Sequence, residues 1–399
     1  MSGGRRVALV ALLFSAMGFA ILPSAALGIM ATFIIEDLSI SRVMLGWVIA
    51  ANVVLAAVLS PLSGRIADRI GGKAAIISVL GLAAAGYFVF GIAPAFGVLF
   101  VAAGIAAMAQ AAANPATNKL IAEDFPPGER GVTTGVKQSG VQAAIMLAGL
   151  ALPSLAIAFG WRGAMLAVAA LPLVAAAAAL VVVPRSQRRS RPSMSARGRL
   201  PRSITGLAVY GLLFGMAGAA TFFVPLFAEE SLGLDPRIGG LAITVAAVVA
   251  FVARILWARY AERRGEYLGP LRSMAMLGVL ASVLLLTSTL WAWLLWPGAI
   301  ITGASTSSWN SVGMLATIEE VGPALTGRAS GRVLLGFLTG LGIGPPLYGA
   351  TVDATGSYTV MWVIAITAAT ATAGFVSVWK RQAPDHGRIG PRNTPHRAG

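Results

Sequence analysis

The chain has 399 residues, of which 57% are hydrophobic and only 11% are charged, with a formal net charge of +15 and no cysteine. A soluble domain is normally about 25% charged, so this chain has too few polar groups to cover a surface that faces water. The composition therefore excludes an ordinary soluble protein, and the lack of cysteine excludes disulfides and thiolate chemistry.

Long apolar runs follow one another along the chain. A bilayer core of about 30 Å needs roughly 20 helical residues, because an α-helix rises about 1.5 Å per residue. Runs of that length recur about twelve times, and they are continuous rather than alternating, which excludes a membrane β-barrel. We therefore predict an all-α integral membrane protein with about 12 transmembrane helices. The predicted spans cover residues 7–33, 43–64, 74–94, 96–120, 132–157, 162–183, 204–228, 238–260, 270–289, 291–318, 328–350 and 358–380.

A strongly polar stretch, GRIADRIGGK at residues 64–73, lies between the second and third predicted spans. A short cytosolic turn explains its glycines and its three bases, since basic residues gather in cytosolic loops. It does not explain Asp68, whose charge opposes that bias. A turn alone therefore does not account for the stretch.

The fourth predicted span carries three amides, Gln110, Asn114 and Asn118, at a spacing of four residues. This spacing places them along one helical face, and a polar face is costly against lipid. We expect these side chains to face the interior, where they contact a solute or hydrogen-bond to neighbouring helices.

The fifth predicted span begins GVTTGVKQSGVQ and holds Lys137, Gln138 and Gln142. Lys137 lies about 9 Å along the axis from the start of this span. A lysine at that depth can extend its ammonium group to the cytosolic interface. The two glutamines continue the polar face deeper than this extension requires, so we favour contact with a solute or a gate.

The longest polar interruption, residues 184–203, contains seven arginines and several Ser and Pro residues. This composition is typical of a cytosolic linker. We therefore divide the chain into an N-terminal six-helix bundle (residues 1–183), the linker (184–203), a C-terminal six-helix bundle (204–380) and a disordered cytosolic tail (381–399).

The second half adds Arg254 in the eighth predicted span and Thr306, Trp309 and Asn310 in the tenth. An arginine at membrane depth should face water or a partner rather than lipid. Lys137 and Arg254 thus place two bases inside spans, with no carboxylate in the middle of any predicted span. If both bases face a cavity between the spans, the cavity is positively charged and favours a small organic anion as the solute. In the alternative, acids at the cytosolic rim neutralise both bases, and these acids are Glu123, Asp124, Glu319 and Glu320.

Basic residues are distributed unevenly among the loops. With the N-terminus in the cytosol, only Arg42, Arg162 and Arg237 of the 30 Lys and Arg residues fall in outer loops. This positive-inside bias predicts a multi-pass protein of the cytoplasmic (inner) membrane with both chain ends in the cytosol. Topology and contact with anionic membrane lipid then explain the basic excess, and no nucleic-acid partner is expected.

The two halves repeat one another at shifts of about 194 and 196 residues. The pairs include Gly46 with Gly240, Arg65 with Arg259, Asp68 with Glu262, Asn114 with Asn310, and Gly140 with Gly336. Lys137 and Gln138 pair instead with Val333 and Leu334, so their polar face is confined to one half. A parallel repeat of six plus six spans is the plan of a transporter with a central cavity.

Together with this repeat and the linker, the stretch at residues 64–73 resembles the signature loop of the major facilitator superfamily. The matching residues are Gly64, Asp68, Arg69, Gly71 and Lys73, and the core of the pattern recurs at Glu262 and Arg263. The resemblance implies two pseudo-symmetric six-helix bundles whose first, fourth, seventh and tenth spans line the cavity. It also implies that Asp68 is held near the start of the eleventh span and bridges the halves in the outward-facing state, so we interpret the stretch as a gate as well as a turn.

The expected function is a secondary transporter that moves a small organic solute by alternating access. The preferred hypothesis for this solute is an organic anion. The alternatives are a multidrug-type efflux transporter and, from another class, a transporter-like membrane sensor without flux. No enzyme, cofactor or metal site is expected, since both histidines lie in the tail and the spans hold no paired acids. Protons or a counter-solute remain as coupling partners, and a monomer is the expected state.

Overall fold

The computed structural model describes residues 3–183 and 200–382, except for the side chains of a few helical residues. The predicted linker at residues 184–203 and the predicted tail at residues 381–399 lie mostly outside this part. The described residues form α-helices and two short 3₁₀ helices, with no strand among them. The predicted all-α membrane fold is confirmed.

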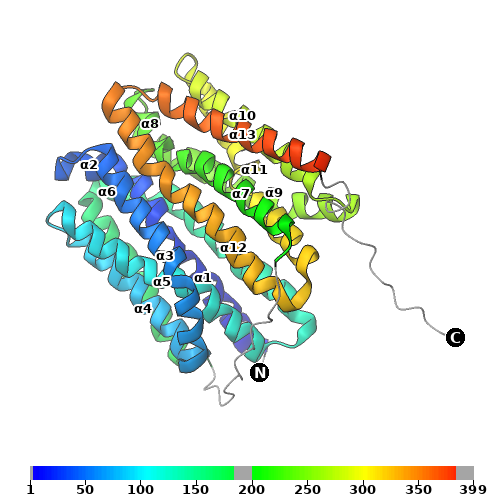
Figure 1. Cartoon of the computed structure of the whole chain (residues 1–399). Coiled ribbons are helices and arrows are strands. Elements are labelled where there is room, and N and C mark those ends of the chain that lie inside the picture. Colours follow the sequence, from blue (N-terminus) through cyan, green and yellow to red (C-terminus); the bar gives the residue numbers. More distant parts are fainter. Residues whose placement is uncertain (1–2, 184–199, 383–399) are drawn as a thin grey trace.

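The first half of the chain contains α1 (Gly3–Ile29), α2 (Ala31–Leu38), α3 (Arg42–Ile70), α4 (Gly72–Gly91), α5 (Phe96–Asp124) and α6 (Pro127–Val182). The second half contains α7 (Arg202–Gly218), η1 (Ala219–Phe223), α8 (Val224–Glu230), α9 (Pro236–Arg264), α10 (Leu268–Thr287), η2 (Ala292–Leu294), α11 (Leu295–Ala304), α12 (Trp309–Thr355) and α13 (Thr359–Gln382). Figure 1 shows α1–α6 grouped on one side of the molecule and α7–α13 on the other, with α12 lying between α3 and α7.

Ten helices in the described residues are long and apolar enough to cross a membrane, against about twelve predicted spans. The difference has two causes. The fifth and sixth predicted spans form one element, α6, which turns sharply at Gly160 with φ 71° and ψ 161°. The tenth predicted span is not a continuous helix, because it is interrupted at residues 305–308 between α11 and α12.

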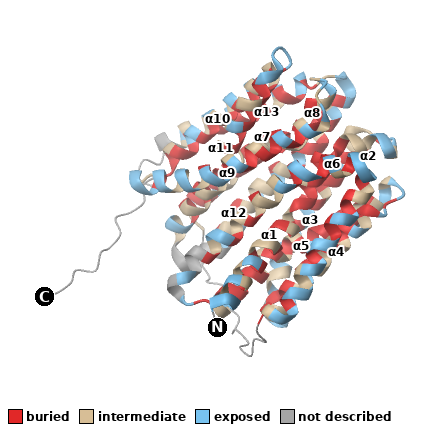
Figure 2. Cartoon of the chain, turned by 180° about the vertical axis from the view of Figure 1, so that it is seen from behind, coloured by how far each residue is buried: buried red, intermediate tan, exposed pale blue. Residues whose placement is uncertain are grey.

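Apolar side chains cover the outside of the bundle as well as its core. Figure 2 shows buried residues along the helix faces that meet inside the molecule and exposed residues on the outer faces and at the helix ends. Large apolar side chains such as Val58, Leu173 and Val181 are exposed. Contiguous exposed apolar surface of this kind suits contact with lipid.

The helix ends gather at two ends of the bundle. We call one the Gly71 end, which holds the start of α1, the turn at Gly71 and the start of α6. We call the other the Arg42 end, which holds the start of α3, the kink at Gly160 and the end of α12.

Glycines allow close helix contacts inside each half, and they do so at corresponding positions. A Cβ atom at Gly140 on α6 would overlap the carbonyl oxygen of Phe14 on α1. A Cβ atom at Gly336 on α12 would overlap the carbonyl oxygen of Ala208 on α7. Gly140 and Gly336 are a predicted repeat pair, and Phe14 and Ala208 are related by the same repeat. The two halves therefore share one backbone packing arrangement.

The contacts between the halves are also related by the repeat. Gly46 on α3 lies against the backbone of Pro345 on α12, and Gly240 on α9 lies against the backbone of Gly149 on α6. Exchanging the halves converts one contact into the other, since Gly46 pairs with Gly240 and Gly149 pairs with Pro345. The bundle thus has an approximate twofold relation between its halves, with α3–α12 and α6–α9 as the two seams.

We predict that Gly140→Ala lowers the stability of the protein by about 1–3 kcal/mol, because its methyl group must displace α1. Thermal unfolding in detergent measures the effect. Gly135→Ala is the matched control on the same helix, because nothing lies within 4 Å of a Cβ atom at that position. An equal response of the two variants would contradict the close contact between α1 and α6.

Candidate functional site

The side chain of Lys137 on α6 is fully buried, at 0% exposure, and its ammonium group has three partners on α5. The Nζ atom donates to Asn114 Oδ1 at 3.2 Å, to Thr117 Oγ1 at 2.8 Å and to Asn118 Oδ1 at 2.6 Å. These three acceptors match the three donors of an ammonium group. All three are neutral, so the charge itself is not compensated.

The geometry of α5 creates this arrangement. Positions 114, 117 and 118 lie on one face because they are three and four residues apart. Thr117 holds its own hydroxyl in place by donating to Ala113 O at 2.7 Å. Gln138, next to Lys137, donates from Nε2 to Asn114 Oδ1 at 3.1 Å. The structure thus brings together predicted residues of the fourth and fifth spans, and it adds Thr117.

Two of the four acids at the rim, Glu123 and Glu320, have other partners. Glu123 lies 3.4 Å from the ammonium group of Lys119, and Glu320 accepts hydrogen bonds from Ser203 and Tyr267. Burial and this carboxylate raise the pKa of the Tyr267 hydroxyl, which therefore stays a donor. Among the described residues, no carboxylate lies within ion-pair distance of Lys137. The neutralisation from the rim that the sequence left open is therefore not present as an ion pair with Lys137 in this part of the chain.

Arg254 on α9 lies apart from Lys137, at the interruption between α11 and α12. Its Nε and Nη2 atoms donate to Ser307 O at 3.2 and 2.9 Å. Trp257, three residues on, donates from Nε1 to Ala304 O at 2.7 Å. An interrupted helix leaves carbonyl groups without intrahelical donors. Arg254 and Trp257 supply donors to two of them, which gives Arg254 a structural task in the absence of any solute.

The predicted residues of the tenth span have separate environments. Thr306 donates to Thr302 O at 3.3 Å. Trp309 is buried, with ring centroids 5.7 Å from Tyr210 and 5.0 Å from Phe337, so it belongs to an aromatic cluster in the core of the second half. Asn310 has a buried Oδ1 atom without a hydrogen-bond partner among the described residues.

The environments of Asn114 and Asn310 differ although the two residues are a repeat pair. Asn114 Oδ1 accepts from Lys137 and Gln138, whereas the buried side chain of Val333 occupies the place that corresponds to Lys137. Gln110 on α5 likewise has a buried Oε1 atom without a partner in the described residues. Buried amide oxygens without donors are rare, so these two positions are unusual within the bundle. Gln142, another predicted residue, is buried on α6.

The predicted gating residues lie at the Gly71 end. The stretch at residues 64–73 is more helical than predicted, because α3 continues to Ile70 and Gly71 alone, at φ 84°, forms the turn to α4. Lys73 donates to Leu180 O at 2.5 Å within the first half. The side chain of Asp68 lies outside the described residues. The remaining members, Gly64, Arg69, Glu262 and Arg263, lie in the last turns of α3 and α9.

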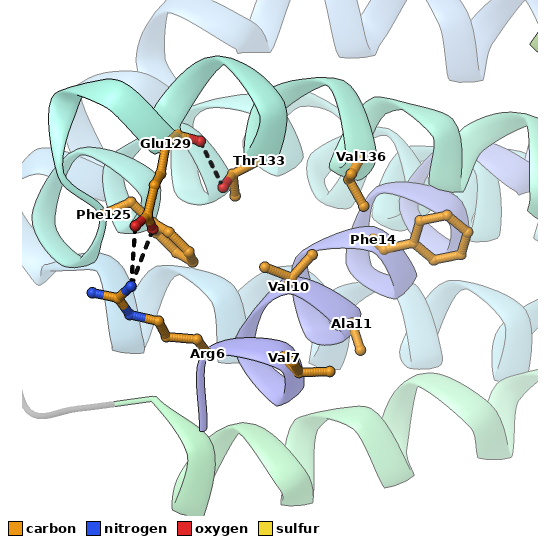
Figure 3. Close-up of a pocket in the computed structure, with 9 residues that line it drawn as sticks. All are labelled: Arg6, Val7, Val10, Ala11, Phe14, Phe125, Glu129, Thr133 and Val136. Carbon is orange, nitrogen blue, oxygen red and sulfur yellow. Dashed lines mark hydrogen bonds and ion pairs between the residues drawn. The ribbon is translucent and has the colours of Figure 1, made fainter. Parts of the chain in front are cut away.

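A cavity of about 610 Å³ opens at the Gly71 end, between α1 and the start of α6. It is lined by Arg6, Val7, Val10, Ala11, Phe14, Phe125, Glu129, Thr133 and Val136. Figure 3 shows the ion pair of Arg6 and Glu129, whose atoms lie 3.1 Å apart, beside the apolar side chains of α1. Thr133 is one helical turn before Lys137 on α6. The sequence interpretation missed this cavity, because its lining comes from two distant segments without a shared motif.

A family model described as Major Facilitator Superfamily matches two overlapping stretches of the chain, residues 8–324 and 209–397. Multidrug resistance protein 2 of Bacillus subtilis (strain 168) is 23% identical over 237 residues, which cover 56% of this chain and 59% of that protein. The galacturonate transporter of Dickeya chrysanthemi is 34% identical over 142 residues, or 35% of this chain and 40% of that protein. The chain therefore spans less than two thirds of the length of these curated relatives.

A solved structure has the same fold over nearly the whole chain. It is the crystal structure of a bacterial homolog of the human lysosomal transporter Spinster in an inward-facing and occupied conformation. The two superpose with a TM-score of 0.78 at 17% sequence identity, over 98% of this chain and 100% of that chain.

We predict that Arg254→Met lowers the stability of the protein by about 1–3 kcal/mol, because the carbonyl of Ser307 loses its donors in a buried setting. Thermal unfolding of the purified protein measures this loss. Arg259→Met is the control, since Arg259 is exposed on the same helix. Full stability of Arg254→Met together with a loss of solute binding would instead assign Arg254 to the cavity.

Proposed function

This chain belongs to the Major Facilitator Superfamily, and we propose that it is a secondary transporter that moves a small organic anion by alternating access. The observation that carries the proposal is the buried ammonium group of Lys137, which has neutral acceptors and no carboxylate among the described residues. A buried charge without a counter-charge is unfavourable. A solute carboxylate would supply the missing charge, so binding the solute would stabilise the protein as well.

The dimensions of the cavity are consistent with such a solute. Ligand pockets in proteins are typically about 300–1,000 Å³, and the cavity at the Gly71 end measures about 610 Å³. The unpartnered oxygens of Gln110 and Asn310 are suited to accept from hydroxyl or amine groups of a solute. The name of one relative, the galacturonate transporter, describes a solute that carries a carboxylate.

We further propose that the Gly71 end faces the cytosol, with both chain ends on that side of the cytoplasmic membrane. The support is the concentration of basic residues in the loops of this end. In this orientation Asp68 and Glu262 would belong to the cytosolic gate, and the cavity would be open to the cytosol. Two bundles at residues 1–183 and 204–380 would move as units, with coupling to protons or to a counter-solute and with a monomer as the active state.

Efflux of drug-like compounds is the second candidate, and a specific observation favours it. Six of the nine residues that line the cavity are apolar, among them Phe14 and Phe125. Apolar lining suits hydrophobic compounds, and one relative is named Multidrug resistance protein 2. Under this alternative Lys137 would have no part in solute recognition.

We predict that Lys137→Gln reduces carboxylate counterflow in proteoliposomes about 30-fold or more, because removing one partner of a buried charge pair costs about 2–5 kcal/mol. The double variant Lys119→Gln/Glu123→Gln is the control. It removes another buried lysine on α5 together with its own partner, and should retain counterflow.

The same assay separates the two candidates. Wild-type flux of carboxylates in Lys137→Gln would overturn the anion proposal. Undiminished efflux of a hydrophobic dye by that variant, without carboxylate counterflow in the parent chain, would establish the second candidate.

A further inference from the structure

Arg42, the first residue of α3, joins the two halves of the molecule at the Arg42 end. Its Nη2 and Nε atoms donate to Glu230 Oε1 and Oε2 at 2.7 and 2.9 Å. Its Nη1 atom donates to Asp353 Oδ1 at 3.2 Å. Glu230 ends α8 and Asp353 lies near the end of α12, so one guanidinium group of the first half binds two carboxylates of the second.

Asp353 also caps α3. The first amides of a helix have no intrahelical acceptor. Two of those of α3 donate to Asp353, Arg42 N to Oδ1 at 3.2 Å and Val43 N to Oδ2 at 2.8 Å, while Met44 N donates to Ser41 Oγ at 3.3 Å. A carboxylate at this position is also favoured by the helix dipole. Two of these three capping hydrogen bonds at the N-terminus of α3 therefore come from the other half of the molecule.

Neighbouring groups hold the carboxylates in place. Tyr358 donates its hydroxyl to Glu230 Oε2 at 2.6 Å. Burial and this carboxylate raise the pKa of Tyr358, so the hydroxyl remains a donor. Thr32 on α2 donates to Glu229 Oε2 at 2.7 Å and forms a second link between the halves.

Directly beneath these contacts the seam between α3 and α12 is closed. A Cβ atom at Gly46 would lie 2.5 Å from Pro345 O, and one at Gly349 would lie 2.5 Å from Arg42 O. Between described residues, the hydrogen bonds and ion pairs that join the halves are those of Arg42, Val43 and Thr32, and one from Thr244 to Met146 O at 3.0 Å. None of them lies at the Gly71 end, where the cavity opens.

We propose that Arg42, Glu230 and Asp353 form a latch that holds the Arg42 end shut while the Gly71 end is open. The latch must release before solute can pass through the Arg42 end. Release exposes to water the two amides that Asp353 caps and the guanidinium group that both carboxylates bind. All of these groups are near the surface, so water can replace each partner, and the contact can break and re-form in every transport cycle. The latch does not depend on the identity of the solute.

Single cysteines report on the two ends, since the chain has no cysteine of its own. Ala50→Cys lies in the seam, one turn of α3 from Gly46, and Ala50 is 5% exposed. Ala11→Cys lies in the wall of the cavity at the Gly71 end. A hydrophilic maleimide is added to the full chain in lipid nanodiscs, where both ends are accessible, and the labelling rate of each cysteine is measured.

We expect Arg42→Gln and Asp353→Ala each to accelerate labelling of Ala50→Cys by about fivefold or more, and to slow labelling of Ala11→Cys. A change of about fivefold corresponds to the free energy that a charged group at a helix terminus contributes. Arg162→Gln is the matched control. It breaks an exposed ion pair with Asp37 at the same end, but both partners belong to the first half, so neither rate should change.

Opposite changes at the two cysteines identify a shift from a conformation closed at the Arg42 end to one closed at the Gly71 end. A loss of packing alone would not produce opposite changes. Unchanged labelling of Ala50→Cys in both variants would overturn the proposal. Faster labelling at both cysteines would also overturn it, because that result indicates a loosened structure rather than a released latch. Neither result depends on transport of an anion, so the proposed function is tested separately.

Discussion

The charge of one lysine inside a membrane span is the constraint on which the site depends. Lipid offers no hydrogen bonds, so each polar group in a span needs a partner within the protein or in a water-filled cavity. Lys137 satisfies its hydrogen bonds with two asparagines and a threonine. No carboxylate among the described residues balances its charge. Under the proposed function, this uncompensated charge is what gives the site its preference for an anion.

A symmetric scaffold carries this asymmetric site. The seams of the bundle are related by the repeat, as the contacts of Gly46 with Pro345 and of Gly240 with Gly149 show. The polar groups are not, since Val333 stands where the repeat would place a second lysine, and Asn310 Oδ1 has no donor among the described residues. Under the proposed function, the two equivalent seams would let the halves tilt about one axis, and the charge of Lys137 in one half alone would orient the solute.

Much of this architecture follows from the sequence. Span length, the repeat and the signature residues predicted the fold and the family. The spacing of the polar residues in the fourth and fifth spans predicted two polar faces, but not that Lys137 would donate to Asn114 and Asn118. Other features depend on contacts between distant segments. The interruption at residues 305–308 has no proline to mark it, and it is compensated by Arg254 from another helix. The latch joins α3, α8 and α12, and sequence spacing cannot show that these three meet.

The most direct test of the account is a structure of the protein bound to a brominated carboxylate that it transports, with the bromine located by anomalous diffraction. The account predicts that the solute carboxylate lies about 3 Å from Lys137 Nζ, a hydrogen-bond distance, and replaces at least one oxygen of Asn114, Thr117 or Asn118. A solute bound with its carboxylate directed away from Lys137, and with those three hydrogen bonds unchanged, would contradict it.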